Sequence, residues 1–139
     1  MYKRQEPELA IAADADGLHL GQLDGPLPLA RARLGDRWIG RSTNDLDQLR
    51  AAVDEGADYV AFGPVFSTRN ISRPKDVQGI ERLVRARAQT PADLALVAIG
   101  GITPDRLSSV ITAGASSWAV IGAIAASDDP VAMTRTLLG

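Results

Sequence analysis

Short apolar segments alternate with segments of helical period along this chain, and this alternation limits the folds open to it. Five apolar segments are expected to form strands: residues 17–22, 37–42, 58–66, 94–101 and 117–124. Between and after them, apolar residues recur at helical spacing within residues 44–57, 77–88, 103–115 and 128–138. Strands that alternate with helices of this length pair in parallel, with the helices outside the sheet. The chain is therefore predicted to be an α/β protein with a parallel sheet.

The number of strands leaves two architectures open at this point. Five parallel strands can form an open doubly wound sheet or part of a (β/α) barrel. The joint between a helix and the next strand is repeated as AADADGLHL, EGADYVAFG and AGASSWAVI, and such repetition favours a barrel. In either fold, ligands bind beyond the carboxyl ends of the strands, where this chain carries GQLD, GRST, GPVFSTRN, GGIT and GAIA.

Composition narrows the classes of function. The chain has 139 residues, a net charge of −2 and no cysteine, which excludes disulfides and thiolate metal sites. It has no basic block, so we expect no nucleic acid partner. It also lacks an apolar run of about 18 to 20 residues, the length that spans a bilayer. We expect a soluble, cytoplasmic protein with no membrane partner.

Two strand ends that carry glycine are candidates for a phosphate site. GGIT at 100–103 precedes a helix for which Thr103 is the expected cap and Pro104 the first residue. Glycine lets backbone N–H groups approach an anion, and the start of the helix adds a favourable dipole. VIGAI at 120–124 follows at the next strand end. The glycines of either motif could merely permit a tight turn. Two adjacent strand ends that carry glycine favour a phosphate site, however, because phosphate in (β/α)8 barrels often binds between the last two strand ends.

Three further polar groups follow strands. Asp24 could hold Mg²⁺ together with substrate oxygens, or could be a solvated loop acid. Ser42 and Thr43 could bind phosphate or cap the next helix, and the single histidine, His19, is expected to be a hydrogen-bonded core group.

Residues 63–76 form the longest stretch without a helical or strand-like hydrophobic period. Arg69, Arg73 and Lys75 within it could clamp a pyrophosphate or could be solvated charges.

Taken together, ADGLHLGQLD, IGRST, GADYVAFGPVFSTRN, VQGIERL, VAIGGITPDRL and AGASSWAVIGAI resemble the thiamine-phosphate synthase family, which includes the thiazole tautomerases. The likeness extends over residues 6–139. It implies a partial (β/α)8 TIM barrel containing about strands 4–8 of eight. It also implies a transferase that uses Mg²⁺ to join an aminopyrimidine-methyl pyrophosphate to a thiazole phosphate, which gives thiamine phosphate and pyrophosphate.

The resemblance assigns roles to individual positions. It implies that Asp24 is an Mg²⁺ ligand and that Ser42 contacts the pyrimidine pyrophosphate. The residues implied to contact the thiazole phosphate come from three loops: Thr68, Arg69, Asn70, Gly101, Ile121 and Gly122.

Three positions depart from the family pattern. Gly122 replaces the usual serine, so a hydroxyl is lost while the backbone N–H remains. Ile71 stands where the family has a lysine that grips pyrophosphate, which makes Lys75 a further candidate for that role. Asn44 stands where many relatives carry histidine, which weakens the tautomerase interpretation.

The first predicted strand matches the family's fourth, so we interpret the chain as N-terminally truncated. Residues 1–5, MYKRQ, match the translation of a transposon end used to prepare sequencing libraries, and we interpret them as an adapter artefact. The resemblance places the first Mg²⁺ aspartate and an Arg/Lys pyrophosphate site in the missing part, so we expect this chain alone to lack synthase activity. A barrel without three strands also has unpaired edges, so we expect the chain to be sticky, marginal in stability or a homo-oligomer such as a dimer. The alternative functions are a thiazole tautomerase and a non-catalytic phosphate-binding half-barrel.

Overall fold

All five predicted strands are present and form one parallel sheet. The computed structural model describes residues 6–68 and 76–138. The strands follow the sheet in sequence order: β1 (Gly17–Leu20), β2 (Trp38–Thr43), β3 (Tyr59–Phe62), β4 (Ala95–Ile99) and β5 (Ser117–Ala119). Each pairs in parallel with the next. Pairing of consecutive strands is the strand order of a (β/α) barrel, whereas a doubly wound sheet reverses its order at one point.

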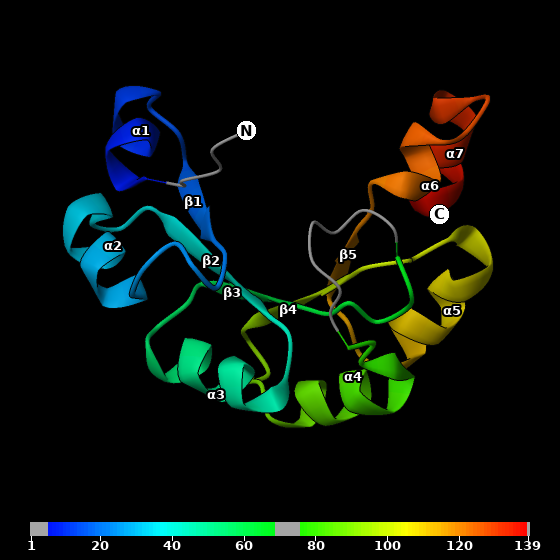
Figure 1. The fold of residues 1–139 in the computed structure, drawn as a ribbon, viewed down its shortest axis with the longest axis horizontal. Coiled ribbons are helices and arrows are strands. Elements are labelled where there is room, and N and C mark those ends of the chain that lie inside the picture. Colours follow the sequence, from blue (N-terminus) through cyan, green and yellow to red (C-terminus); the bar gives the residue numbers. More distant parts are fainter. Residues whose placement is uncertain (1–5, 69–75, 139) are drawn as a thin grey trace.

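The helices that link the strands lie outside the curved sheet. They are α2 (Leu27–Leu34), α3 (Leu46–Asp54), α4 (Gly79–Ala88) and α5 (Pro104–Thr112). Helix α1 (Pro7–Ala12) precedes β1, whereas α6 (Gly122–Ala125) and α7 (Pro130–Leu138) follow β5. Figure 1 shows α2 to α5 following the convex side of the sheet, with β1 and β5 at its two ends. This is the arrangement of a partial (β/α)8 barrel and confirms the predicted fold class. Among the described residues, no helix is long and apolar enough to cross a membrane.

Alternation along the strands separates a core face from a concave face. Leu20, Ile39, Val60, Phe62 and Leu96 are fully buried and belong to the core that the helices cover. Residues at the intervening positions point to the opposite face, since strand side chains alternate. That face holds the polar side chains discussed below.

The structure corrects the predicted bounds of two strands. The strand predicted over 58–66 ends at Phe62, because Pro64 follows and has no N–H for a sheet ladder. The strand predicted over 117–124 ends at Ala119, and residues from Gly122 onward form α6 instead.

Helix α2 was not predicted, because two prolines interrupt its sequence, PLPLARARL. In the structure Pro26 is the N-cap and Pro28 lies in the first turn, where the missing N–H costs nothing. Its apolar residues Leu27, Ala30 and Leu34 are buried.

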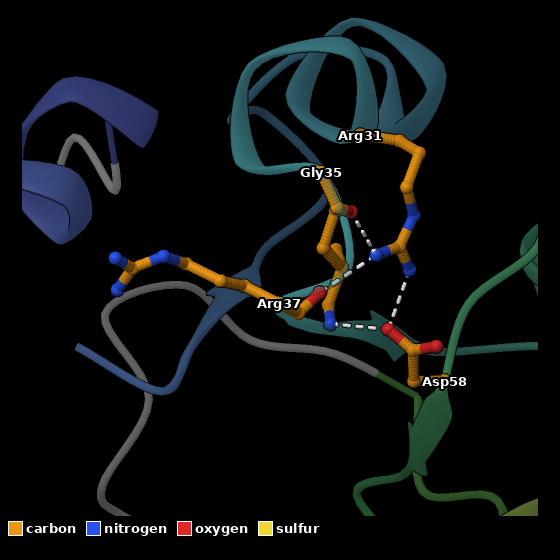
Figure 2. A network of polar contacts seen from close by, with 5 residues as sticks. Arg31, Gly35, Arg37 and Asp58 are labelled. Atoms are coloured by element: carbon orange, nitrogen blue, oxygen red, sulfur yellow. Dashed lines mark hydrogen bonds and ion pairs between the residues drawn. The ribbon is translucent and has the colours of Figure 1, made fainter. Parts of the chain in front are cut away.

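A polar network joins α2 to the starts of β2 and β3, at the edge of the sheet away from the strands' carboxyl ends (Figure 2). The Asp58 carboxylate accepts hydrogen bonds from the Arg31 guanidinium and from the backbone N–H of Ile39, the latter at 2.6 Å. The same guanidinium donates to the carbonyls of Gly35 (2.9 Å) and Arg37 (2.6 Å). Both members of the ion pair are about two-thirds buried, so Asp58 holds helix and strands in one arrangement.

We expect Asp58→Ala to lower the free energy of unfolding by about 1 to 3 kcal/mol, because two donors lose their acceptor in a partly buried place. Urea unfolding followed by circular dichroism measures the change. The matched control is Asp47→Ala, which removes the exposed ion pair with Arg50 and should cost less than about 0.5 kcal/mol. Equal losses from both substitutions would contradict a special role for Asp58.

Candidate functional site

A cavity of about 500 Å³ lies at the carboxyl ends of β3, β4 and β5. Its walls come from the loops after these strands, from the end of β2 and from the starts of α5 and α6. The lining residues are Asn44, Gly63, Pro64, Ser67, Thr68, Ile99, Gly100, Gly101, Ile102, Thr103, Arg106, Ala119, Val120, Ile121, Gly122, Ala123 and Ala126. Most of these have small or apolar side chains, so backbone groups form much of the cavity surface.

Two glycines allow the loop after β3 to pack against the end of β4. Gly101 has a positive φ of 65°, and a Cβ there would lie 2.4 Å from the Ser67 carbonyl oxygen. The Phe66 N–H donates to the carbonyl of Gly100 at 3.0 Å. Gly100 also has a positive φ, 92°. A side chain at Gly101 would therefore push the loop outward and change the cavity wall.

Arg106, in the first turn of α5, is the one charged side chain among the described lining residues. Its Nη1 donates to the carbonyl of Gly101 at 2.8 Å, and its Cζ lies 4.8 Å from the centroid of the Phe66 ring. The guanidinium is thus held at the cavity wall by a hydrogen bond and by the face of an aromatic ring.

A second cluster lies on the concave face of β1, β2 and β3. His19 Nδ1 lies 2.9 Å from the Tyr59 hydroxyl, and His19 Nε2 lies 2.8 Å from the Ser42 hydroxyl. The register places His19 beside Gly40, and Gly40 beside Tyr59. A Cβ on Gly40 would lie 2.0 Å from Tyr59 Cζ, so this glycine lets the Tyr59 ring cross β2 and reach His19.

Burial controls the ionisation of this cluster. The pKa of His19 is lowered mainly by burial, with Arg41 adding to the effect and Asp24 opposing it. Burial also raises the pKa of Tyr59. Both groups are therefore neutral near pH 7, and the imidazole donates one hydrogen bond and accepts the other.

The loop after β1 carries the predicted metal ligand. One oxygen of the Asp24 carboxylate, Oδ2, accepts a hydrogen bond from the Gly21 N–H at 2.7 Å, which fixes the carboxylate near the strand end. The neighbouring Gln22 donates its side-chain amide to the Ser42 carbonyl. In the part of the chain that the structure describes, no three His, Cys, Asp or Glu residues group into a metal site. Asp24 alone can therefore supply one ligand and needs oxygens from a substrate and from water.

The structure brings part of the predicted site together. Thr68, Gly101, Ile121 and Gly122 all line the cavity. Ser42 lies in the neighbouring cluster, and Asn44, two residues further along, lines the cavity. Arg69, Asn70, Ile71, Arg73 and Lys75 lie outside the described residues.

The predicted cap of α5 is confirmed in position but not in its hydrogen bond. Thr103 is the N-cap of α5 by position, but its side chain makes no capping bond. Asp45 caps α3 by accepting from the Gln48 N–H at 2.8 Å, and Asp129 accepts from the Ala132 N–H at 2.9 Å.

Sequence reasoning missed two residues of the site. Tyr59 belongs to it only because three strands are in register, which no local pattern reveals. Arg106 could have been found from the sequence, because it lies within one helical turn of the GGIT motif.

The sequence of this chain is similar to those of known thiamine-phosphate synthases. A family model described as "Thiamine monophosphate synthase" matches residues 4–124. Thiamine-phosphate synthase of Mycolicibacterium vanbaalenii is 48% identical over 133 residues, which cover 95% of this chain and 59% of the relative. The enzyme of Thermosynechococcus vestitus is 47% identical over 94% of this chain and 37% of its own length. The chain thus spans about three-fifths or less of these relatives.

Solved structures agree. Thiamine phosphate pyrophosphorylase from Pyrococcus furiosus has a TM-score of 0.87 and 33% identity, covering 96% of this chain and 63% of that one. A 3-hexulose-6-phosphate synthase, at a TM-score of 0.69 and 19% identity, shares the fold alone. Because the family model matches most of the residues, and the Pyrococcus furiosus structure shares both fold and sequence with the chain, this chain belongs to the thiamine monophosphate synthase family.

Proposed function

We propose that this chain supplies the thiazole-phosphate site, and part of the pyrimidine-pyrophosphate site, of a thiamine-phosphate synthase. The observation that carries the proposal is the glycine-lined cavity at the ends of β4 and β5, next to the polar cluster of Ser42 and His19. The reaction joins an aminopyrimidine-methyl pyrophosphate to a thiazole phosphate. The proposed setting is the cytoplasm, where small phosphorylated metabolites are found.

The proposed anion contacts are of two kinds. Near Gly101 and Gly122 the backbone can approach a phosphate closely, because neither residue has a side chain. Thr68 adds a hydroxyl group from the loop after β3. Arg69 and Asn70 stay candidates on sequence alone, as does Ile121 through its backbone.

Ser42 is proposed to donate a hydrogen bond to a pyrophosphate oxygen, and its neighbours allow that direction. Two arrangements of protons satisfy the neutral cluster. In one, Tyr59 donates to His19 Nδ1 and His19 Nε2–H donates to Ser42, which leaves the Ser42 proton for a ligand. In the other arrangement, the Ser42 hydroxyl donates its proton to His19 Nε2 and can only accept hydrogen bonds from a ligand. A bound anion favours the first, so His19 and Tyr59 act as positioning residues.

Asp24 fits Mg²⁺ that arrives with pyrophosphate. Mg²⁺ usually binds one or two carboxylates together with substrate phosphates and water, and Asp24 supplies a carboxylate in the loop after β1. When bound, Mg²⁺ would neutralise charge on the departing pyrophosphate. The Gly21 N–H holds the carboxylate in place for this role.

The chemistry needs little acid–base assistance from the chain. The bond between the pyrimidine methylene carbon and the pyrophosphate oxygen breaks, and its electron pair leaves with pyrophosphate. The thiazole nitrogen then gives its lone pair to the resulting cation and forms the C–N bond. The chain's own contribution is to hold two anionic substrates in position and to donate hydrogen bonds to the leaving group.

The outer strands of the described sheet support one further proposal. β1 and β5 each pair on one side only among the described residues. We propose that the chain forms a homo-oligomer, as expected for a sheet with open edges. Analytical ultracentrifugation measures this directly.

A chimera tests the proposed function. Residues 6–139 replace the matching segment of the Mycolicibacterium vanbaalenii relative, with which they share 48% identity. We expect the chimera to form thiamine phosphate from both substrates in the presence of Mg²⁺, measured by chromatography. A folded chimera that forms none would contradict the proposal.

Within that chimera, we expect Ser42→Ala to lower kcat/KM for the pyrimidine pyrophosphate by about tenfold to a hundredfold, the cost of one hydrogen bond to a charged group. Ser108→Ala, an exposed serine on α5, is the control and should leave kcat/KM unchanged. Equal values for all three proteins would show that Ser42 does not contact the leaving group.

The lowered pKa of His19 predicts a pH dependence of stability. Because folding lowers the pKa, the unfolded chain binds more protons than the folded one between the two values, and stability falls as pH drops below about 6.5. His19 is the only histidine in the sequence, so His19→Asn should reduce the pH dependence of the unfolding free energy between about pH 7 and 5.5. An unchanged slope in the variant would exclude His19 as its source.

Lys75 is a candidate for the contact with pyrophosphate that the family's lysine makes and that Ile71 cannot make. We expect Lys75→Ala in the chimera to weaken binding of the pyrimidine pyrophosphate, measured by calorimetry, while Arg85→Ala on the outer face of α4 leaves it unchanged. If both variants bind as the unsubstituted chimera does, Lys75 has no such role.

A further inference from the structure

We infer that Arg106 makes the cavity at the ends of β4 and β5 selective for a phosphorylated thiazole over the corresponding alcohol. The inference rests on the proposed function, which places the thiazole phosphate in this cavity. It assigns the choice between phosphate and alcohol to one side chain on α5.

The guanidinium is fixed before any ligand binds. Arg106 lies in the first turn of α5, and its backbone N–H donates to the Thr103 carbonyl at 3.0 Å. From there the side chain turns back along the wall, donates from Nη1 to the Gly101 carbonyl at 2.8 Å and lies over the Phe66 ring. A side chain held at both its edge and its face loses less freedom on binding a ligand than a free one.

The contact with Gly101 also changes what the cavity presents to an anion. A backbone carbonyl at the wall would repel a phosphate, since its oxygen carries partial negative charge. Arg106 covers that oxygen with one N–H. A guanidinium has five N–H donors, so others remain for a phosphate oxygen, in the planar geometry that suits phosphate.

The described residues give the Arg106 guanidinium no carboxylate partner. No ion pair formed among the described residues involves Arg106. The adjacent Asp105 does not line the cavity. Its side chain is exposed, and its pKa is lowered chiefly by a hydrogen bond with the Thr103 side chain, with Arg106 as a minor cause. Among the described lining residues, Arg106 therefore supplies the one charged side chain of the cavity wall.

Phosphate selectivity separates this role from a structural one. An arginine needed only to hold the Gly101 carbonyl would affect both ligands equally when replaced. An arginine that contacts phosphate affects the phosphorylated ligand alone. Gln at this position keeps an N–H donor for Gly101 while removing the charge, and Lys keeps the charge while removing the planar fork.

The experiment is isothermal titration calorimetry on the 139-residue chain. The ligands are 4-methyl-5-(2-phosphoethyl)thiazole and the unphosphorylated 4-methyl-5-(2-hydroxyethyl)thiazole. We expect Arg106→Gln to weaken binding of the phosphate by about tenfold or more, the effect of losing a charge-assisted hydrogen bond, and to leave binding of the alcohol unchanged. Arg106→Lys should fall between the two. Arg85→Gln makes the same charge change on the exposed side of α4 and should match the unsubstituted chain. Circular dichroism confirms that each variant is folded.

Failure of this inference and failure of the proposed function give different results. If the unsubstituted chain binds the phosphate and Arg106→Gln binds it equally well, the inference is wrong and the proposed function stands. Equal weakening of both ligands reduces Arg106 to a structural role and also overturns the inference. If the unsubstituted chain binds neither ligand, the thiazole site itself is wrong and both proposals fall.

Discussion

The parallel direction of every strand is the constraint on which the rest of this structure depends. In a parallel sheet all carboxyl ends lie at one edge, so the loops after the strands must meet there. The cavity at β3, β4 and β5 and the cluster of His19 and Ser42 lie at or next to that edge. The opposite edge carries the network of Asp58 and Arg31, which joins helix and strands and has no catalytic group. Stability and binding are thus assigned to opposite ends of the same strands.

Close backbone approach shapes both parts of the site. At Gly40 the absence of a side chain lets the Tyr59 ring cross a strand and bond to His19. At Gly101 it lets the loop after β3 rest on the end of β4, and it leaves a carbonyl for Arg106 to cover. In each case the missing side chain leaves space that a neighbouring ring or loop occupies. A search for catalytic residue types alone would overlook both glycines.

The sequence predicted the class of fold because hydrophobic period is a local property. It missed α2, whose prolines mask a helix that tertiary packing stabilises, and it extended β3 and β5 beyond their ends. The position of Gly101 and Gly122 at one rim of the sheet could be predicted, since each follows a strand of a parallel sheet, and both line the cavity. The bond between His19 and Tyr59 could not, because it joins residues forty positions apart through the register of a third strand. Side chains that act across strands are visible only once the strands are aligned.

The proposed reaction brings two anions together, and the cavity and the cluster of His19 and Ser42 lie at different strands of the sheet. Both substrates are anions, so bringing their reacting atoms together opposes the repulsion of their phosphates. Under the proposed function each anion has its own anchoring point: Asp24 lies in the loop after β1 and Ser42 lies near the end of β2, whereas Gly101 and Arg106 follow β4. Holding each phosphate at its own strand end would keep the negative charges apart while the carbon and nitrogen atoms that react approach each other between them. The spacing of the strand ends along the sheet edge would then set the distance between the two anions.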